Sequence, residues 1–433
     1  MNKFFIFVLI GVFFSSCSLN KNSKFWTSAE KINFENSNFK KIFEDKKILE
    51  KSFNQNLKIK LSKKVLTNKK NTYQTNNDGR SNFDGTLEKS SRYKFSKIKN
   101  FHQYEPEISF NNKNIIFFDN KGTILQFDYN SNLIWKKNYY SKYEKKLSPI
   151  LQFSNNGKYL VVADNLANYY VLDLKTGDQL WKKNNLAPFN SQIKIYKDKF
   201  FIIDFSNTLR CFSLLNGKEI WNISTENTLI RSNKKLSMVI SNDKIFFNNS
   251  IGDITAVDIN KGEVLWQLPT QSSSVYESAF SLETSDLILD KDALYFSNNR
   301  NQIFSININV GNFNWENKVN SIIRPLITEN LLFTASLEGY LVIMEKKSGN
   351  IIRITDIFKN FKPKKRPNIR PTGFSMGLKN IYLSTNNGRL LVVDINSGKT
   401  ISTLKIDNDK ISRPVILDKS LFVAKDNAII KLN

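Results

Sequence analysis

Few residues in this 433-residue chain could perform catalysis or hold a metal. There is one histidine, His102, and there are two cysteines, Cys17 and Cys211. Imidazole acid–base chemistry and zinc sites need more of these side chains, and the phosphate-binding pattern GxxxxGK(S/T) does not occur. Cys211 stands in an apolar run and is predicted to be a buried small hydrophobe. We therefore expect no catalytic residue, no metal and no cofactor, and a protein that binds its partners without transforming them.

Cys17 follows a leader that resembles a secretion signal. The apolar run 4–14 is too short to span about 30 Å of hydrocarbon. Residues 14–17 resemble a bacterial lipobox, in which the Cys is diacylated and becomes the N-terminus, and Ser18 resembles the outer-membrane sorting case. We predict a signal peptide over residues 1–16 and a lipid on Cys17 that holds the protein at the periplasmic side of the outer membrane. An ordinary cleaved signal with an incidental Cys is the alternative.

The stretch after the leader, residues 17–90, is predicted to be a tether rich in Lys and Asn. Residues 18–85 contain 15 Lys and Arg against 7 Asp and Glu, and the rest of the net charge of +25 is spread along the chain. An arm for nucleic acid would concentrate charge far more, so no nucleic-acid partner is expected. Apolar residues at helical spacing predict one short amphipathic helix in the tether: Phe39, Ile42, Phe43 and Leu49.

A repeated phrase that ends in Trp dominates the remaining sequence. One example is YVLDLKTGDQLW, and two further phrases carry Arg353 and Ser402 in the Trp position. Successive Trp positions of this phrase lie 38 to 49 residues apart, with no long helical pattern between them. Because one sheet face cannot bury itself alone, each Trp is predicted to pack against the next repeat. These residues are Trp135, Trp181, Trp221, Trp266 and Trp315.

Two turns divide each repeat into strands. In one repeat Asp173 is followed by Gly177 and then by Trp181, and the same offsets recur along the chain. An Asp or Asn side chain accepts the N–H groups of the following turn, and Gly adopts a positive φ at no steric cost. In most repeats, a second Gly or Asn stands six residues before the Asp position, and a nearly continuous apolar run precedes it. Each repeat therefore supplies four strands, and such units at this period predict a β-propeller.

The predicted fold is all-β, an eight-bladed propeller of four-stranded antiparallel blades over residues 91–433. Seven full repeats occupy about residues 101–405, and residues 413–433 supply only three further strands. The alternating segment 92–98 is predicted to donate the missing outer strand, so that the two ends of the propeller pair and close the ring. Seven blades with a leftover C-terminal hairpin is the alternative.

The phrase D-x-x-x-G-x-x-x-W at residues 173–181 resembles the PQQ-like repeat, and the resemblance extends over about residues 92–433. Combined with the lipobox, it resembles the BamB family, the lipoprotein subunits of the outer-membrane β-barrel assembly (BAM) machinery. Residues 73–82 are similar to a segment that precedes the propeller in some members. The resemblance implies a non-catalytic scaffold that binds a POTRA domain of BamA and other BAM subunits, and that assists insertion of β-barrel proteins into the outer membrane.

The resemblance also implies a partner-binding surface made of two loops. The family's acidic loop is matched by Glu283, although Ser281 stands where a second acid is expected and Thr228 replaces an apolar residue in the other loop. That other loop, with apolar residues before an Arg, is matched by Leu229, Ile230 and Arg231. An apolar contact flanked by opposite charges would fix the register of a partner. The alternative is that these are ordinary solvated loop residues.

Quinoprotein dehydrogenases share these repeats and are the enzymatic alternative. They stack the quinone against a ring formed by adjacent Cys residues and hold Ca²⁺ with a carboxylate and an amide. This chain has no adjacent Cys pair and no recognisable Ca²⁺ loop. A propeller that binds a different envelope component is a further alternative.

The segment Lys359–Pro371 interrupts the repeat with six basic residues and three Pro. Its composition predicts an extended, exposed loop. Such a loop is either simply solvated or a site for anionic lipid headgroups or an acidic partner.

Overall fold

The computed structural model describes residues 51–62, 75–104, 106–226, 234–271 and 282–433. The predicted signal peptide, the lipid site Cys17 and the predicted helix between Phe39 and Leu49 lie outside the described residues. Residues 48–433 belong to one compact unit. No helix within the described ranges is both long and apolar enough to cross a membrane.

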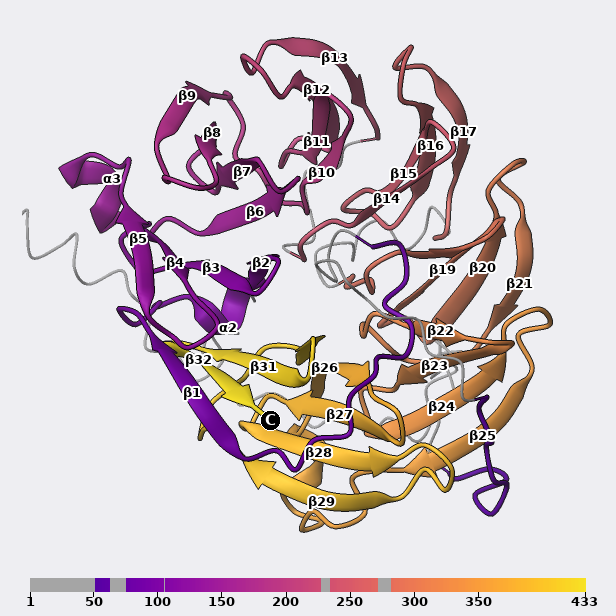
Figure 1. Ribbon diagram of the computed structural model, residues 1–433. Coiled ribbons are helices and arrows are strands. Elements are labelled where there is room, and N and C mark those ends of the chain that lie inside the picture. Colours follow the sequence, from indigo (N-terminus) through magenta and orange to yellow (C-terminus); the bar gives the residue numbers. More distant parts are fainter. Residues whose placement is uncertain (1–50, 63–74, 105, 227–233, 272–281) are drawn as a thin grey trace, which may run out of the picture. The chain divides into compact units, whose positions relative to one another are not determined.

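Eight four-stranded antiparallel sheets surround a central channel (Figure 1). Blade 1 contains β2 (Ser109–Asn111), β3 (Asn114–Phe118), β4 (Ile124–Phe127) and β5 (Leu133–Lys137); blade 2 contains β6 (Leu151–Asn155), β7 (Tyr159–Asp164), β8 (Asn168–Asp173) and β9 (Gln179–Asn184); blade 3 contains β10 (Lys194–Tyr196), β11 (Lys199–Ile203), β12 (Thr208–Ser213) and β13 (Glu219–Ser224); blade 4 contains β14 (Met238–Ser241), β15 (Lys244–Asn248), β16 (Ile254–Asp258) and β17 (Val264–Leu268).

The second half of the ring repeats the pattern. Blade 5 contains β18 (Ile288–Asp290), β19 (Ala293–Asn298), β20 (Gln302–Asn307) and β21 (Phe313–Asn317); blade 6 contains β22 (Leu326–Thr328), β23 (Leu331–Ala335), β24 (Tyr340–Glu345) and β25 (Ile351–Asp356); blade 7 contains β26 (Pro371–Met376), β27 (Asn380–Thr385), β28 (Arg389–Asp394) and β29 (Thr400–Lys405); blade 8 contains β30 (Val415–Leu417), β31 (Ser420–Lys425), β32 (Ala428–Leu432) and β1 (Lys89–Lys94). The prediction of an eight-bladed all-β propeller is confirmed.

Blade 8 closes the ring with strands from both ends of the propeller. The outer strand β1 pairs antiparallel with β32, with Tyr93 opposite Ile429. The predicted donor segment 92–98 overlaps β1, but the strand begins three residues earlier, at Lys89, and ends at Lys94. Closure by pairing of the two ends is therefore confirmed, and the seven-bladed alternative is wrong.

The core lies between the faces of neighbouring blades, because the middle strands of each sheet are buried on both sides. Every residue of β11 after Lys199 is buried, for example. Aromatic rings join the blades: the rings of Tyr169 in blade 2 and Phe212 in blade 3 have centroids 4.5 Å apart. The nearly continuous apolar runs in the sequence therefore reflect strands that are covered on both faces.

The repeated Asp–Gly–Trp phrase joins each blade to the next. The Asp173 carboxylate accepts the N–H groups of Lys175 and Thr176, each at 2.9 Å, and so forms the turn between β8 and β9. Gly177 in that turn has φ +75, and a Cβ on it would lie 2.8 Å from the ring of Trp135, which belongs to the preceding blade. This glycine is required both for its backbone conformation and for the close approach of the ring.

Residues 75–83, hereafter the strap, cross the ring of inner strands before the chain enters β1 (Figure 1). The N–H of Leu289 in β18 donates to the carbonyl of Asn76 at 2.9 Å, and that of Ser81 donates to Met376 in β26 at 2.9 Å. Between them, the Asn77 amide exchanges two hydrogen bonds with the backbone of Ile327 in β22. The strap therefore contacts the inner strands of consecutive blades on one side of the channel.

Residues 51–62 lie along blades 6 and 7. Phe53 forms an antiparallel bridge with Ile354, and the N–H of Ile59 donates to the carbonyl of Asn396 at 3.0 Å. Nη1 of Arg80 in the strap donates to the carbonyl of Ser62 at 2.8 Å. The part of the chain that packs against the propeller therefore begins well before β1.

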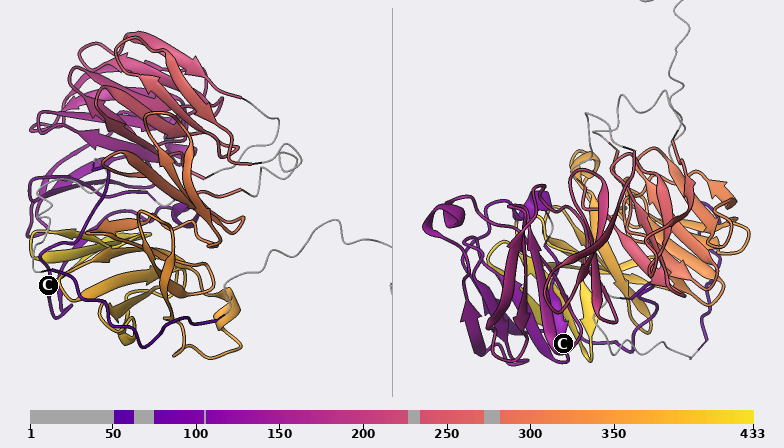
Figure 2. Two further views of the ribbon diagram at one scale, coloured as in Figure 1. Left: turned by 90° about the vertical axis from the view of Figure 1, so that its right-hand side faces the viewer. Right: turned by 90° about the horizontal axis from the view of Figure 1, so that it is seen from above.

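Connections on one face of the ring carry the short helices α2 (Phe101–Tyr104), α3 (Lys142–Lys146) and η3 (Arg366–Asn368) (Figures 1 and 2). Helix η3 corrects the expectation for Lys359–Pro371. The segment is largely exposed, as predicted, but it is not extended. Arg366 forms a 2.7 Å ion pair with Asp356, and Ile369 is buried, so the segment folds back on blade 6 in compact turns.

Candidate functional site: the charged mouth of the channel

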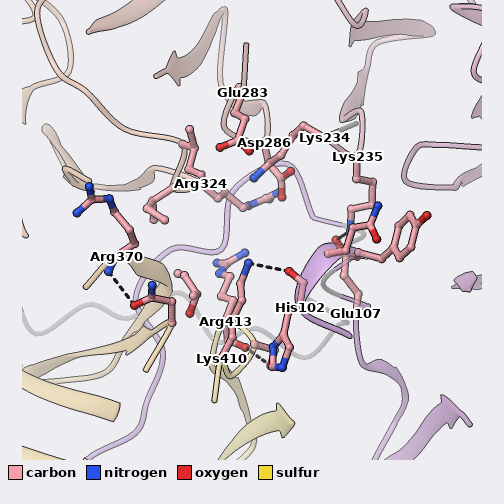
Figure 3. A pocket seen from close by; sticks show the side chains of 18 of the residues that line it. His102, Glu107, Lys234, Lys235, Glu283, Asp286, Arg324, Arg370, Lys410 and Arg413 are labelled. Carbon is pink, nitrogen blue, oxygen red and sulfur yellow. Dashed lines mark hydrogen bonds and ion pairs between the residues drawn. The ribbon is translucent and has the colours of Figure 1, made fainter. Parts of the chain in front are cut away.

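The segments that lead into the eight inner strands surround a cavity of about 600 Å³ at one mouth of the channel (Figure 3). A volume of this size is typical of ligand sites. All eight blades contribute to its wall, from Glu107 before blade 1 round to Arg413 before blade 8. The cavity is thus built by the connections between blades, where a propeller can vary its sequence without disturbing the sheets.

Charged side chains occupy equivalent positions round this wall. Each stands two residues before the inner strand of its blade, where the chain turns from the outer edge towards the channel. These residues are Glu107, Asp286, Arg324 and Arg413. Repetition of the blade therefore gives four of the eight blades a charged side chain that lines the cavity from the same position.

The charges form a network that crosses the channel. Glu107 forms an ion pair with Lys235, both largely buried. Arg324, which is 4% exposed, lies 3.3 Å from the Asp78 carboxylate and 3.8 Å from that of Asp286. Such buried pairs are costly to break, because removing one partner leaves an uncompensated charge in a poorly hydrated place.

Lys194, the first residue of β10, is buried beside this network. Burial, and after it the positive charge of Arg324, lowers the pKa of its ammonium group to about 7, although Glu107 and Asp286 act in the opposite direction. Desolvation disfavours the charged form of a lysine.

The strap lies beneath the cavity and completes the network. Its Asp78 carboxylate contacts both Arg324 and Arg413, and Nη2 of Arg324 donates to the carbonyl of Thr75 at 2.9 Å. The strap bonds to the inner strands at Leu289, Ile327 and Met376, and none of these three residues lines the cavity. The cavity is therefore backed by the strap and opens towards the face that carries the connecting segments.

Glu283, the predicted acidic contact residue, is exposed at the rim of this cavity. Its backbone is fixed by hydrogen bonds of 3.0 Å to Asn299 in both directions. Three other predicted contact residues lie outside the described residues: Leu229, Ile230 and Arg231. The described residues that follow them, Lys234 and Lys235, line the same mouth as Glu283. Sequence reasoning missed the network itself, whose signal was a charged residue recurring two positions before an inner strand.

The repeat Trp residues lie on the other side of the blades, away from the cavity. Nε1 of Trp266 donates to the carbonyl of Ile308 in the next blade at 3.0 Å, and Trp181, Trp221 and Trp315 make the same bond to their own neighbours. Trp135 is buried against Gly177.

Cys211 is fully buried, and burial raises the pKa of its thiol to about 12, so it stays protonated at neutral pH. Across the described ranges no cluster of three or more His, Cys, Asp or Glu residues could hold a metal ion.

Residues 120–355 match the family model described as outer membrane protein assembly factor BamB. The chain belongs to the BamB family. The matched residues cover more than half of the chain and include blades 2 to 5 in full. None of the curated proteins matches the chain in sequence.

Solved structures with the same fold include BamB from Moraxella catarrhalis, which is 14% identical, with a TM-score of 0.66 over 80% of this chain and 100% of that one. The quinohemoprotein alcohol dehydrogenase from Comamonas testosteroni is 9% identical, with a TM-score of 0.61 over 82% of this chain and 78% of that one. The computationally designed Ika8 protein is 12% identical, with a TM-score of 0.59 over 81% and 98%. At these identities the likeness shows the propeller fold alone.

Proposed function

We propose that this protein is a non-catalytic, periplasmic scaffold that binds a POTRA domain of BamA and thereby assists assembly and insertion of β-barrel proteins into the outer membrane. The observation that carries the proposal is its membership of the BamB family over residues 120–355. The charged channel mouth is compatible with this role, because it offers fixed charges on a rigid ring for a partner to dock against.

The proposed contact surface combines Glu283 with the loop that contains Leu229, Ile230 and Arg231. The two loops lead into blades 4 and 5, which are neighbours in the ring. Opposite charges on Arg231 and Glu283 would fix the orientation of a POTRA domain, while Leu229 and Ile230 would provide the desolvated contact.

Co-purification from detergent-solubilised envelopes tests the proposal. Tagged wild-type protein should recover BamA and other BAM subunits, whereas Arg231→Glu and Glu283→Lys should recover several-fold less. Glu263→Lys is a matched control, because Glu263 is also an exposed acid and lies in the outer turn of blade 4. Failure of the wild-type protein to recover BamA would favour a propeller that binds a different envelope component.

We also propose that a lipid on Cys17 anchors the protein to the inner leaflet of the outer membrane, with the preceding residues removed as a signal peptide. Metabolic labelling with palmitate should mark the wild-type protein but not Cys17→Ser. Labelling of both proteins, or of neither, would contradict the anchor.

The enzymatic alternative is a dehydrogenase that uses PQQ, and the likeness to the Comamonas testosteroni enzyme motivates its test. Calorimetry of the purified protein with PQQ and Ca²⁺ should give no stoichiometric heat. Tight, stoichiometric uptake would overturn the scaffold proposal.

A further inference from the structure

The channel mouth carries more positive than negative charge. Asp286 lies within ion-pair distance of Arg324, and Glu107 is paired with Lys235, so both acids of the inner wall already have basic neighbours. Three further basic side chains stand at the rim against one acid, Glu283: Lys234, Arg370 and Lys410. Figure 3 shows these groups arranged round one opening.

Arg324 supports an attraction for anions deeper in the cavity. Its side chain is 2% exposed, and its Nε and Nη1 atoms make no hydrogen bond within the described part of the chain, although carboxylates lie at ion-pair distance. A buried guanidinium group normally uses its five donors in short, directed hydrogen bonds. The group is therefore only partly satisfied by Asp78 and Asp286.

The molecule itself shows how this channel holds an extended polypeptide by a carboxylate, although the strap also carries one base, Arg80. The strap runs along the inner strands in an extended form, with backbone hydrogen bonds at Asn76 and Ser81 and a parallel bridge between Arg80 and Met376. Its one acidic side chain, Asp78, contacts both arginines at the base of the cavity. The space above the strap has the same wall and further basic residues, but about 600 Å³ of it is open.

We propose that the open mouth of the channel binds an acidic, extended segment of a second polypeptide, whose carboxylates contact Lys234, Arg370 and Lys410 at the rim. A backbone group of that segment would be received by the amide side chain of Gln152 on the wall. The volume far exceeds what one phosphate or carboxylate group would fill, which favours a peptide over a small anion. The site shares its rim with Glu283 of the proposed POTRA contact surface, but Lys234, Arg370 and Lys410 are not among the proposed POTRA contacts.

The test measures binding of a fluorescent peptide of alternating Glu and Ser to the purified mature protein, by polarisation at low salt. The double variant Arg370→Glu/Lys410→Glu should bind about tenfold more weakly than wild type, because two attractive charges at the rim become repulsive. The control Lys347→Glu/Lys399→Glu changes the net charge equally at two exposed outer turns that do not line the cavity, and should bind within about twofold of wild type. Matching thermal melts would show that all variants fold.

Three results would overturn the proposal: equal binding of a Gln–Ser peptide, equal loss in the rim and control variants, or no binding of the acidic peptide. Displacement of the peptide by tripolyphosphate at much lower concentrations would also overturn it and would identify a small-anion site. The assay contains no BamA, so a lack of peptide binding would not contradict the co-purification result. Likewise, a loss of BamA recovery would not contradict peptide binding.

Discussion

The carboxylate of Asp78 lies 3.3 Å from Nε of Arg324, and it fixes the chain that precedes the propeller inside the ring. Arg413, from blade 8, contacts the same carboxylate. One side chain therefore joins the strap to blades 6 and 8, on either side of blade 7. The segment before β1 therefore contributes to the stability of the propeller.

Replacing Asp78 with Asn should lower the free energy of unfolding by about 3–5 kcal/mol, because two largely buried guanidinium groups would lose their shared counter-charge. Urea denaturation followed by tryptophan fluorescence measures this change. Asp84→Asn is the control: Asp84 pairs with a largely exposed Lys379, and such a surface pair contributes about 0–1 kcal/mol. Equal, small effects of the two substitutions would show that the strap is not held by this charge.

Trp266 and Gly311 form one of the contacts between consecutive blades. A Cβ on Gly311 would lie 2.6 Å from the Trp266 ring, and Gly311 has φ +73, so Gly311→Ala should destabilise the protein both by strain and by displacing the ring. Trp266→Ala should cost about 3 kcal/mol through lost burial and a residual cavity. The double variant should cost less than the sum, since both changes remove the same contact. Full additivity in thermal denaturation would argue against direct coupling.

Lys194 should make stability depend on pH. Its pKa is about 7 in the folded protein and about 10.4 when unfolded, so between these values the unfolded chain binds more protons. Stability therefore rises as the pH increases from about 7 towards 10, and the cost of charging Lys194 is fully present below pH 7. Comparison with Lys194→Met separates the titration of Lys194 from the titrations of Glu107, Asp286 and Lys235, which lie near it.

In that comparison, the melting temperature of the wild type should approach that of Lys194→Met as the pH is raised from 6 to 9. Lys244→Met is a control at the first residue of another strand, β15. A constant difference between wild type and Lys194→Met over this range would mean that the Lys194 pKa is not lowered.

Arg353 occupies the position of the repeat Trp in blade 6 and holds the N-terminal segment in place. Its Nη1 donates to the carbonyl of Leu57 at 2.8 Å, and its Nη2 donates to that of Ile395 in blade 7 at 2.9 Å. Arg353→Met should keep much of the buried volume but release residues 53–59. Faster hydrogen exchange at Phe53 and Ile59 is the expected result, with exchange in β24 unchanged. Uniformly faster exchange would instead indicate general destabilisation.

The blade architecture could be predicted because its signal is repeated. Asp173, Gly177 and Trp181 form a turn and a contact between neighbouring blades, so their spacing recurs in most of the repeats. In blade 2 the position equivalent to Gly122 is occupied by Ala167, which also has a positive φ, 67. Because this residue is not a glycine, the turn could not be recognised from the sequence there. The closing strand was located to within a few residues because an incomplete last repeat requires one.

The candidate site could be predicted only in part. Glu283 was found through a family resemblance and lies at the cavity rim. The strap network was not predicted, because the partners of Asp78 are distant in sequence and only the closed ring brings them together. The sequence showed that Arg353 replaces the repeat Trp. It did not show that Arg353 donates to the carbonyl of Leu57, because Leu57 lies far outside the repeat. The compact turns of Lys359–Pro371 depend likewise on the pairing of Arg366 with Asp356.

We propose that the face around the channel mouth docks on the barrel assembly machinery. Site-specific photo-cross-linking in living cells tests it most directly, with a photoreactive amino acid at position 283 and, as a control, at position 399 in an outer turn of blade 7. A cross-link to a POTRA domain of BamA is expected from position 283 and none from position 399. Cross-links to BamA from position 399 alone, or from neither position while the protein is fully expressed, would contradict it.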